Sequence, residues 1–236
     1  CYFVRPDSKE LQYIAGVDSE FEELLAELRS KENQRDSDQV QDLDTWVFQS
    51  LQERKSPGGS SMSWSDYHKK NSAFADDGRR YLQLHSAELP NDVPMIAIHD
   101  FDESWTRISM LRTVLDRYVR YGLRRSESQT DHELSDSVVS RLRLLGIQIT
   151  ETGSRPCASP AGRVMAYSSS KISALEKIVS TERTTLGESI RIVIVTDFEK
   201  TSATSLVDGI LDDEAGGAIA AFRSMVSHGE GDSLDP

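Results

Sequence analysis

Two groups of residues in this sequence have the types and spacing that chemistry requires. The first is the polar run Thr196, Asp197 and Glu199, which directly follows the apolar segment 192–195. Polar groups at the end of a buried parallel strand face the ligand crevice of an α/β sheet, and paired carboxylates there could instead hold a divalent ion. The second group is an arginine cluster at 117–125, whose planar side chains suit pairing with phosphate or carboxylate.

The arginine cluster combines positive charge with aromatic rings. Its members are Arg117, Arg120, Arg124 and Arg125, with Tyr118 and Tyr121 between them. This composition is typical of a surface that follows a phosphate backbone and stacks bases, which makes DNA or RNA the expected partner. In the alternative interpretation, the arginines lie on a solvated helix face and pair with the acidic segments on either side.

The charge of the chain is unevenly distributed along its length. The net charge is -12, which argues against nucleic-acid wrapping by the chain as a whole. Residues 105–165 nevertheless carry ten arginines and no lysine against six acids, whereas residues 1–104 and 166–236 are acidic. Any contact with phosphate is therefore expected in the middle third.

Several catalytic chemistries lack their required residues. The histidines have no metal-ligand spacing, and Cys1 and Cys157 are too few for a zinc site or a disulfide scaffold. The loop 55–63 has paired glycines but not the lysine of a phosphate-binding loop, and no G-x-S-x-G elbow occurs. A nuclease would need a second acidic cluster beside Asp197 and Glu199. We expect no catalytic residue and no metal, with Asp197 acting as a cap or a hydrogen-bonding group.

Residues 1–102 are predicted to form an acidic helical region. The expected helices are one capped by Asp18 or Ser19 that runs to about Leu28, one over 40–51 and one over 64–86. Between the last two lies the loop 55–63, whose Pro, Gly and Ser content predicts flexibility.

Residues 103–236 are predicted to form a second region, in which arginine-bearing helices lead into a small α/β part. The expected elements are helices over 104–122, 130–145, 168–186 and 216–226, and strands over 147–150 and 191–196. The last strand is apolar on both faces, which indicates a parallel sheet covered by helices. The predicted fold class is α/β, with a mainly helical N-terminal region.

The segment 166–203 resembles the start of the second RecA-like lobe of superfamily 2 helicases and DNA translocases, in particular the bacterial DEAD/DEAH-box type. The resemblance rests on Ser168 to Lys171, which opens a helix, on Val193 to Phe198 and on the phrase from Leu142 to Gly153. It covers about residues 105–226 and implies a RecA-like parallel sheet. It also adds Lys171 to the expected nucleic-acid contacts.

The resemblance implies a fragment of an ATP-binding hydrolase that moves along DNA or RNA. The Walker loop, the D-E-x-H or D-E-A-D box and the Gln-x-x-Gly-Arg-x-x-Arg segment are absent from this sequence. Because hydrolysis needs these groups, the fragment is expected to be inactive alone, with ATP and Mg²⁺ bound only in the parent protein. The remaining lobes of the parent are then its partners.

Two functions remain open from the sequence. The first is a helicase lobe scaffold that contacts nucleic acid, and the alternative is a non-enzymatic module for protein–protein interaction. Neither an export signal nor an apolar run long enough for a membrane occurs, and cysteines are few, so a cytoplasmic location is expected. The choice between DNA and RNA, the direction of movement and the oligomeric state do not follow from these residues.

Overall fold

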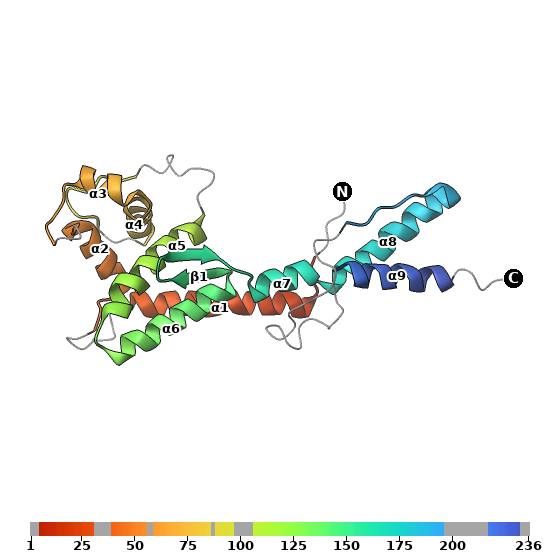
Figure 1. The fold of residues 1–236 in the computed structure, drawn as a ribbon, viewed down its shortest axis with the longest axis horizontal. Coiled ribbons are helices and arrows are strands. Elements are labelled where there is room, and N and C mark those ends of the chain that lie inside the picture. Colours follow the sequence, from red (N-terminus) through yellow and green to blue (C-terminus); the bar gives the residue numbers. More distant parts are fainter. Residues whose placement is uncertain are drawn as a thin grey trace. The chain divides into compact units, whose positions relative to one another are not determined.

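The computed structural model describes most of the chain and divides it into two compact units (Figure 1). The described residues are 5–30, 39–55, 59–85, 88–96, 106–195 and 217–231. The central unit contains residues 20–143 and 147–157, and the terminal unit contains residues 1–19, 144–146 and 158–236. The boundary that the sequence predicts between residues 102 and 103 lies outside the described residues.

The described residues are mainly helical, with one small sheet (Figure 1). The helices are α1 (Ser8–Arg29), α2 (Leu43–Glu53), α3 (Trp64–Lys70), α4 (Ser72–Leu84), α5 (Arg107–Arg117), α6 (Gln129–Leu144), α7 (Pro160–Tyr167), α8 (Ser169–Leu186) and α9 (Gly217–Gly231). Shorter helical turns are the π-helix η2 (Tyr118–Gly122) and the 3-10 helices η3 (Leu123–Arg125) and η4 (Gly187–Ser189). Strands β1 (Ile147–Thr150) and β2 (Gly153–Pro156) pair antiparallel, with Ile147 opposite Pro156.

Helix α1 begins well before the predicted start. The backbone N–H of Glu10 donates to Asp7 Oδ1 (2.9 Å), and the N–H of Asp7 donates to Glu10 Oε2 (2.8 Å). This reciprocal pair is a capping box, which satisfies backbone donors that a helix start leaves unpaired. The prediction of a cap at Asp18 or Ser19 is therefore wrong, because the stronger cap lies upstream.

Helices α2, α6, α8 and α9 lie near their predicted positions, whereas α7 and β2 were not predicted and the helix predicted over 104–122 is α5 followed by the π-helix η2. The apolar periodicity of α2, α6 and α8 is confirmed, and Gly146 follows α6 with a positive φ of 83°, as expected after a helix. The helix predicted over 64–86 is instead two helices, because Ser63 caps α3 and the chain breaks at Asn71 before α4.

The core of the central unit lies where α4 packs against α5, α2 and α3 (Figure 1). Trp46 of α2 meets the rings of Phe74 and Tyr118 edge to face, with centroids 6.1 and 5.4 Å away. Such pairs add to the free energy of burying the rings. The fully buried side chains include Leu43, Leu51, Tyr81, Leu82, Met110, Leu111, Leu115, Leu123 and Leu142.

A hydrogen-bonded cluster joins three helices of the central unit. The Tyr81 hydroxyl donates to Asp44 Oδ1 (2.5 Å), and Arg29 donates to both Asp44 oxygens at 3.1 and 3.2 Å. Burial raises the pKa of Tyr81 most, and the hydrogen bond to Asp44 raises it further, so the phenol keeps its proton. The cluster therefore fixes α1, α2 and α4 through one carboxylate.

The π-helix η2 fits tightly against α2. A Cβ atom added to Gly122 would lie 3.1 Å from Trp46 Nε1 and 3.3 Å from Val40 Cγ1. The Tyr118 hydroxyl donates to the carbonyl oxygen of Gln41 (2.8 Å) on the same side. A side chain at this position would require the indole or Val40 to shift by a few tenths of an ångström.

In the terminal unit, α8 packs against α9, and the Ser224 hydroxyl donates to Glu176 Oε1 (2.5 Å). The prediction of a buried strand over 191–196 is wrong for the described residues 191–195, which lie in no strand and expose Val193 and Val195 at 88% and 87%. An apolar strand is buried only when neighbouring strands pair with it, and no described segment does so here. The described residues are thus helical with a small antiparallel sheet.

Replacing Gly122 by Ala is expected to destabilise the protein by about 1–3 kcal/mol, because the added methyl group overlaps Trp46. Gly78→Ala in α4 is the matched control. A methyl group there meets Leu51 and Val47 at ordinary distances of 3.4–3.6 Å, and an alanine in a helix gains up to about 1 kcal/mol. Urea unfolding measures both, and equal midpoint shifts would contradict the tight fit.

The pH dependence of stability is expected to include a contribution from His85, whose ring lies 4.7 Å from that of Tyr81. Burial lowers the pKa of His85, and Arg29 adds to this while Asp44 opposes it. Because the folded-state pKa is below the unfolded value of about 6.5, this contribution is complete above that pH and is lost as the pH falls through the folded pKa.

The measurement is urea unfolding at pH 7.5 and at more acidic pH. His85→Gln should reduce the loss of stability on acidification, whereas His132→Gln, at an exposed position in α6, should not. An unchanged pH dependence in the His85 variant would show that burial does not hold this ring neutral.

Candidate anion-binding site

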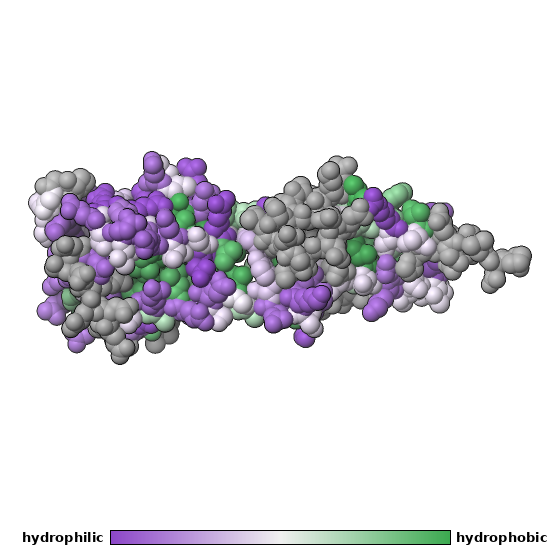
Figure 2. Space-filling model, turned by 90° about the horizontal axis from the view of Figure 1, so that it is seen from below, coloured by the Kyte–Doolittle hydropathy of each residue, from purple (hydrophilic) through white to green (hydrophobic). Residues whose placement is uncertain are grey.

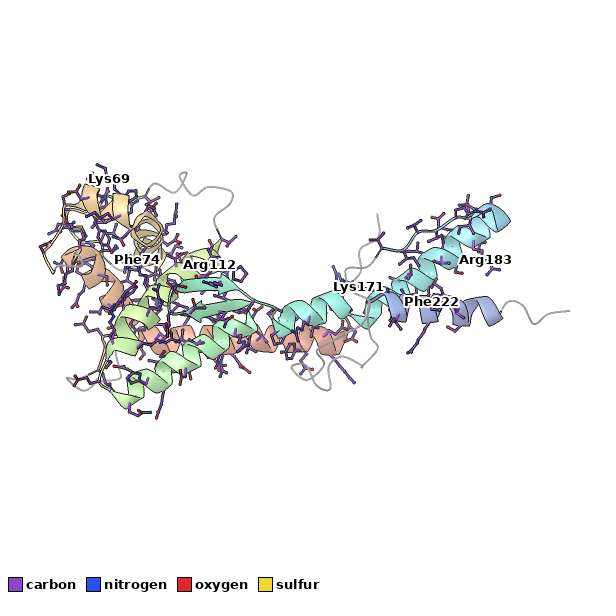
Figure 3. All side chains as sticks on the ribbon, in the orientation of Figure 1. Lys69, Phe74, Arg112, Lys171, Arg183 and Phe222 are labelled. Atoms are coloured by element: carbon purple, nitrogen blue, oxygen red, sulfur yellow. The ribbon has the colours of Figure 1, made fainter. Side chains whose placement is uncertain are left out.

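A cleft of about 860 Å³ opens in the central unit, a volume within the range of about 300–1,000 Å³ that small-molecule sites occupy. Its walls come from α2, the loop that follows α2, α3, α4 and the turn from α5 to η3. The lining residues are Trp46, Ser50, Glu53, Lys55, Gly59, Met62, Tyr67, Lys70, Asn71, Phe74, Arg117, Tyr121 and Arg125. Figure 3 labels Phe74 on α4, whose ring forms part of this wall.

Three cations of the cleft lack a carboxylate partner among the described residues: Lys70, Arg117 and Arg125. Seven arginines elsewhere in the central unit pair with carboxylates, whereas Arg112, Arg124, Arg143 and Arg155 have no such pair among the described residues. These pairs are Arg29–Asp44, Arg54–Asp92, Arg79–Asp76, Arg80–Asp77, Arg107–Glu22, Arg120–Asp116 and Arg141–Glu20. Within the lining, Glu53 pairs with Lys55 at 2.7 Å. The cleft therefore brings together three cations that no carboxylate of the described residues neutralises.

The ring of Tyr121 lies at the centre of this charge. The guanidinium carbons of Arg125, Arg120 and Arg117 are 4.7, 4.9 and 5.1 Å from its centroid. Each cation–π contact stabilises the arrangement by about 0.5–1 kcal/mol at an exposed site. Because the three cations repel one another, a bound anion would lower the electrostatic energy of the cluster.

Arg117 is held in place by two further contacts. Its Nη2 donates to Asn71 Oδ1, and its guanidinium carbon lies 5.0 Å from the ring centroid of Phe74. The asparagine is the residue that separates α3 from α4, so the break between these helices supplies the acceptor. The guanidinium group is thus ordered before any ligand arrives.

The π-helix explains why the cluster forms at this point of the chain. Residues four positions apart lie near one face of a helix, which brings Arg117, Tyr121 and Arg125 together. The segment that follows Arg117 consists of the wider turn of η2 and then the tighter turn of η3, which ends at Arg125. Single π-helical turns inside helices are frequent at functional sites.

The structure separates the predicted nucleic-acid contacts into different environments. Arg117 and Arg125 line the cleft, whereas Arg124 is exposed and outside the lining. Arg120 Nε donates to the carbonyl oxygen of Glu151 (3.1 Å), and Nη1 donates to Asp116 Oδ2 (3.2 Å), so this side chain holds β1–β2 against α5. Lys171, the remaining predicted nucleic-acid contact, lies in the first turn of α8 in the terminal unit (Figure 3).

The strand-end group Thr196, Asp197 and Glu199 lies outside the described residues, so its predicted role stays a prediction. The sequence interpretation missed Lys70 and Asn71, which lie far from the arginine cluster along the chain. Locally, the sequence shows only that Lys70 is a basic residue in the last turn of α3, a position where positive charge is favoured. Tertiary packing alone brings them to Arg117.

The loop after α2 forms one wall of the cleft. Lys55 and Ser61 form an isolated antiparallel bridge, and the N–H of Met62 donates to the carbonyl oxygen of Arg54 (3.1 Å). These bonds bring the two ends of the loop that the sequence predicts over 55–63 together.

The described lining is rich in cations, hydroxyl groups and aromatic rings. Among the described residues that line it, none is a histidine, a cysteine or an aspartate. Burial raises the pKa of Tyr67, so its hydroxyl remains neutral at the wall of the cleft. Cations, neutral hydroxyls and aromatic rings together suit an anion that carries an apolar part.

Comparisons with known proteins identify no relative: no family model matches the chain, and neither curated proteins nor solved structures gave a significant match. Within the described residues, no group of three or more histidine, cysteine, aspartate or glutamate side chains has the geometry of a metal site. None of the described helices combines the length and apolar character needed to cross a membrane. The function therefore has to be argued from the cleft and the sequence.

Arg120 and Arg124 of the arginine cluster are expected to respond differently to mutation, because Arg120 is half-buried and Arg124 is exposed. Arg120→Ala should cost about 1–3 kcal/mol of stability, because it leaves the buried Asp116 carboxylate, whose Oδ1 already lacks a partner, without its guanidinium. Arg124→Ala should stay within about 0.5 kcal/mol. Thermal and urea unfolding measure the difference, and an Arg120 variant as stable as the Arg124 variant would contradict its structural role.

Proposed function

We propose that this chain is a non-catalytic part of a superfamily 2 helicase or translocase, and that its central unit contacts nucleic acid at the cleft around Tyr121. The observation that carries the contact is that three cations without a carboxylate partner among the described residues line one cleft together with the ring of Tyr121. Guanidinium groups beside aromatic rings are the usual means of holding phosphates of a single strand.

The acidic remainder of the chain supports a localised contact. With a net charge of -12, most of the surface repels a phosphate backbone. The attraction is then confined to the cleft, so the number of neutralised phosphates is small. Binding of this kind is weak at physiological salt and strengthens at low salt with only a shallow slope, because few counterions are released.

The motor part of the proposal rests on the resemblance of residues 142–203 to the second RecA-like lobe. The succession of α8, η4 and the apolar segment 192–195 is compatible with it, because an exposed apolar segment of β-forming residues is suited to join a sheet. In this proposal the parallel sheet is completed by other parts of the parent protein, which also bind ATP and Mg²⁺ and act in the cytoplasm.

A second candidate function is a protein–protein interaction module. It is favoured by exposed apolar side chains in the terminal unit, among them Val193, Val195 and Phe222, which is 68% exposed. Figure 2 shows hydrophobic residues at the surface of the part that contains α8 and α9. Apolar patches of this kind mark interaction sites more often than nucleic-acid contacts.

Fluorescence anisotropy with labelled single-stranded and duplex DNA and RNA at several salt concentrations tests the proposal. Arg117→Ala with Arg125→Ala should weaken binding about tenfold or more and lower the salt slope by about 2. The matched control is Arg112→Ala with Arg143→Ala, which removes the same charge at exposed positions outside the cleft.

Two results would count against nucleic-acid contact at the cleft. Absence of binding at every ionic strength would leave the interaction module as the better candidate. Equal weakening in both double variants would show that net charge, rather than the cleft, sets the affinity. Circular dichroism and unfolding curves confirm that each variant is folded.

A further inference from the structure

The cations of the cleft converge from three separate elements. Lys70 is the last residue of α3, Arg117 the last of α5 and Arg125 the last of η3, and all three line the same cavity. A lysine and two arginines without carboxylate partners form a stronger positive site than a single phosphodiester of a passing strand requires.

We propose that the cleft is a terminal-phosphate site, which binds a phosphate monoester at Lys70, Arg117 and Arg125. The monoester is either the phosphorylated end of a strand or a free nucleoside monophosphate. Binding of a phosphorylated nucleic-acid end rests on the proposed nucleic-acid function, whereas binding of a free nucleoside monophosphate does not.

The charge of the site fits a monoester better than a diester. A phosphate monoester carries about -1.5 to -2 charges at pH 7 and three acceptor oxygens, because its second ionisation lies near pH 6. A phosphodiester within a strand carries one charge. Two arginine forks and a lysine supply enough donors for all three terminal oxygens.

The shape of the cleft also suits an end group. The loop segment with Gly59 and Met62 forms one wall, and Asn71 at the α3–α4 break lines the cavity beside Arg117. A cavity of about 860 Å³ is large enough for one nucleotide, within the usual range of about 300–1,000 Å³ for small ligands. The side chains of Trp46 and Phe74 give it an apolar part for the organic portion of the ester.

The cationic groups are partly fixed in advance. Arg117 is oriented by Asn71 and Phe74, and Arg125 by the ring of Tyr121. Ordering before binding reduces the conformational entropy that the ligand must remove. Lys70 is exposed and forms no hydrogen bond or ion pair with the described residues, so its side chain is the one of the three that can most easily move onto a phosphate.

The test compares oligonucleotides of one sequence that carry a 5′-phosphate, a 3′-phosphate or hydroxyl groups at both ends, each with an internal fluorophore. Adenosine monophosphate and adenosine are titrated in parallel by calorimetry. We expect one phosphorylated oligonucleotide to bind about tenfold more tightly than the hydroxyl form, as a charge-assisted bond implies. Adenosine monophosphate should bind where adenosine does not.

Lys70→Ala tests the site itself, with Lys69→Ala as the matched control. Lys69 is the preceding residue of α3, is exposed and does not line the cleft (Figure 3). Lys70→Ala should weaken binding of the phosphorylated oligonucleotide more than binding of the hydroxyl form, so that most of the preference for the phosphorylated end is lost. Lys69→Ala should retain the preference.

The outcomes separate this inference from the proposed function. Equal affinity for all oligonucleotides, with no binding of adenosine monophosphate, overturns the terminal-phosphate site and leaves nucleic-acid contact intact. Binding of adenosine monophosphate that is lost in Lys70→Ala, without any oligonucleotide binding, supports the site and contradicts the nucleic-acid function. Absence of binding by every probe overturns both.

Discussion

Trp46 packs directly on the backbone of Gly122, and the positions of the cationic residues depend on this contact. The indole fixes α2 against η2, and the same ring packs on Phe74 and Tyr118. Because interiors are close-packed, moving the indole would displace the turn that follows α5. Arg117 and Arg125 lie on either side of that turn, so their approach to Tyr121 is a consequence of core packing.

The distribution of ion pairs gives the molecule its electrostatic character. Carboxylates pair with seven arginines of the central unit, and two of these, Arg29 and Arg120, are structural groups that join separate elements. The cleft differs because its walls contribute aromatic rings, an amide and hydroxyl groups, with Glu53 already paired to Lys55. Positive charge therefore remains where the surface is concave, and a concave site of one sign concentrates the field on a ligand.

The terminal unit has a different chemistry. Its described core includes Val164 and Ala221, and the capping carboxylate Glu10 accepts a hydrogen bond from Ser168 at 2.6 Å. The apolar segment 192–195 is left exposed. A segment of β-forming residues without pairing partners is energetically costly in isolation, which is the physical reason for expecting a sheet or a protein partner to cover it.

The sequence by itself determined the elements whose causes are local. Apolar periodicity predicted α2, α6 and α8, and the alternating run Ile147 to Thr150 predicted β1. The sequence also located the basic region. Only the tertiary structure decided which arginines are paired: Arg120 donates to the carbonyl oxygen of Glu151, and Lys70 lines the same cleft as Arg117 although the two are far apart in the sequence. It also decided that residues 192–195 are exposed among the described residues, because strand burial depends on partners distant in sequence, whereas periodicity and capping act within a few residues.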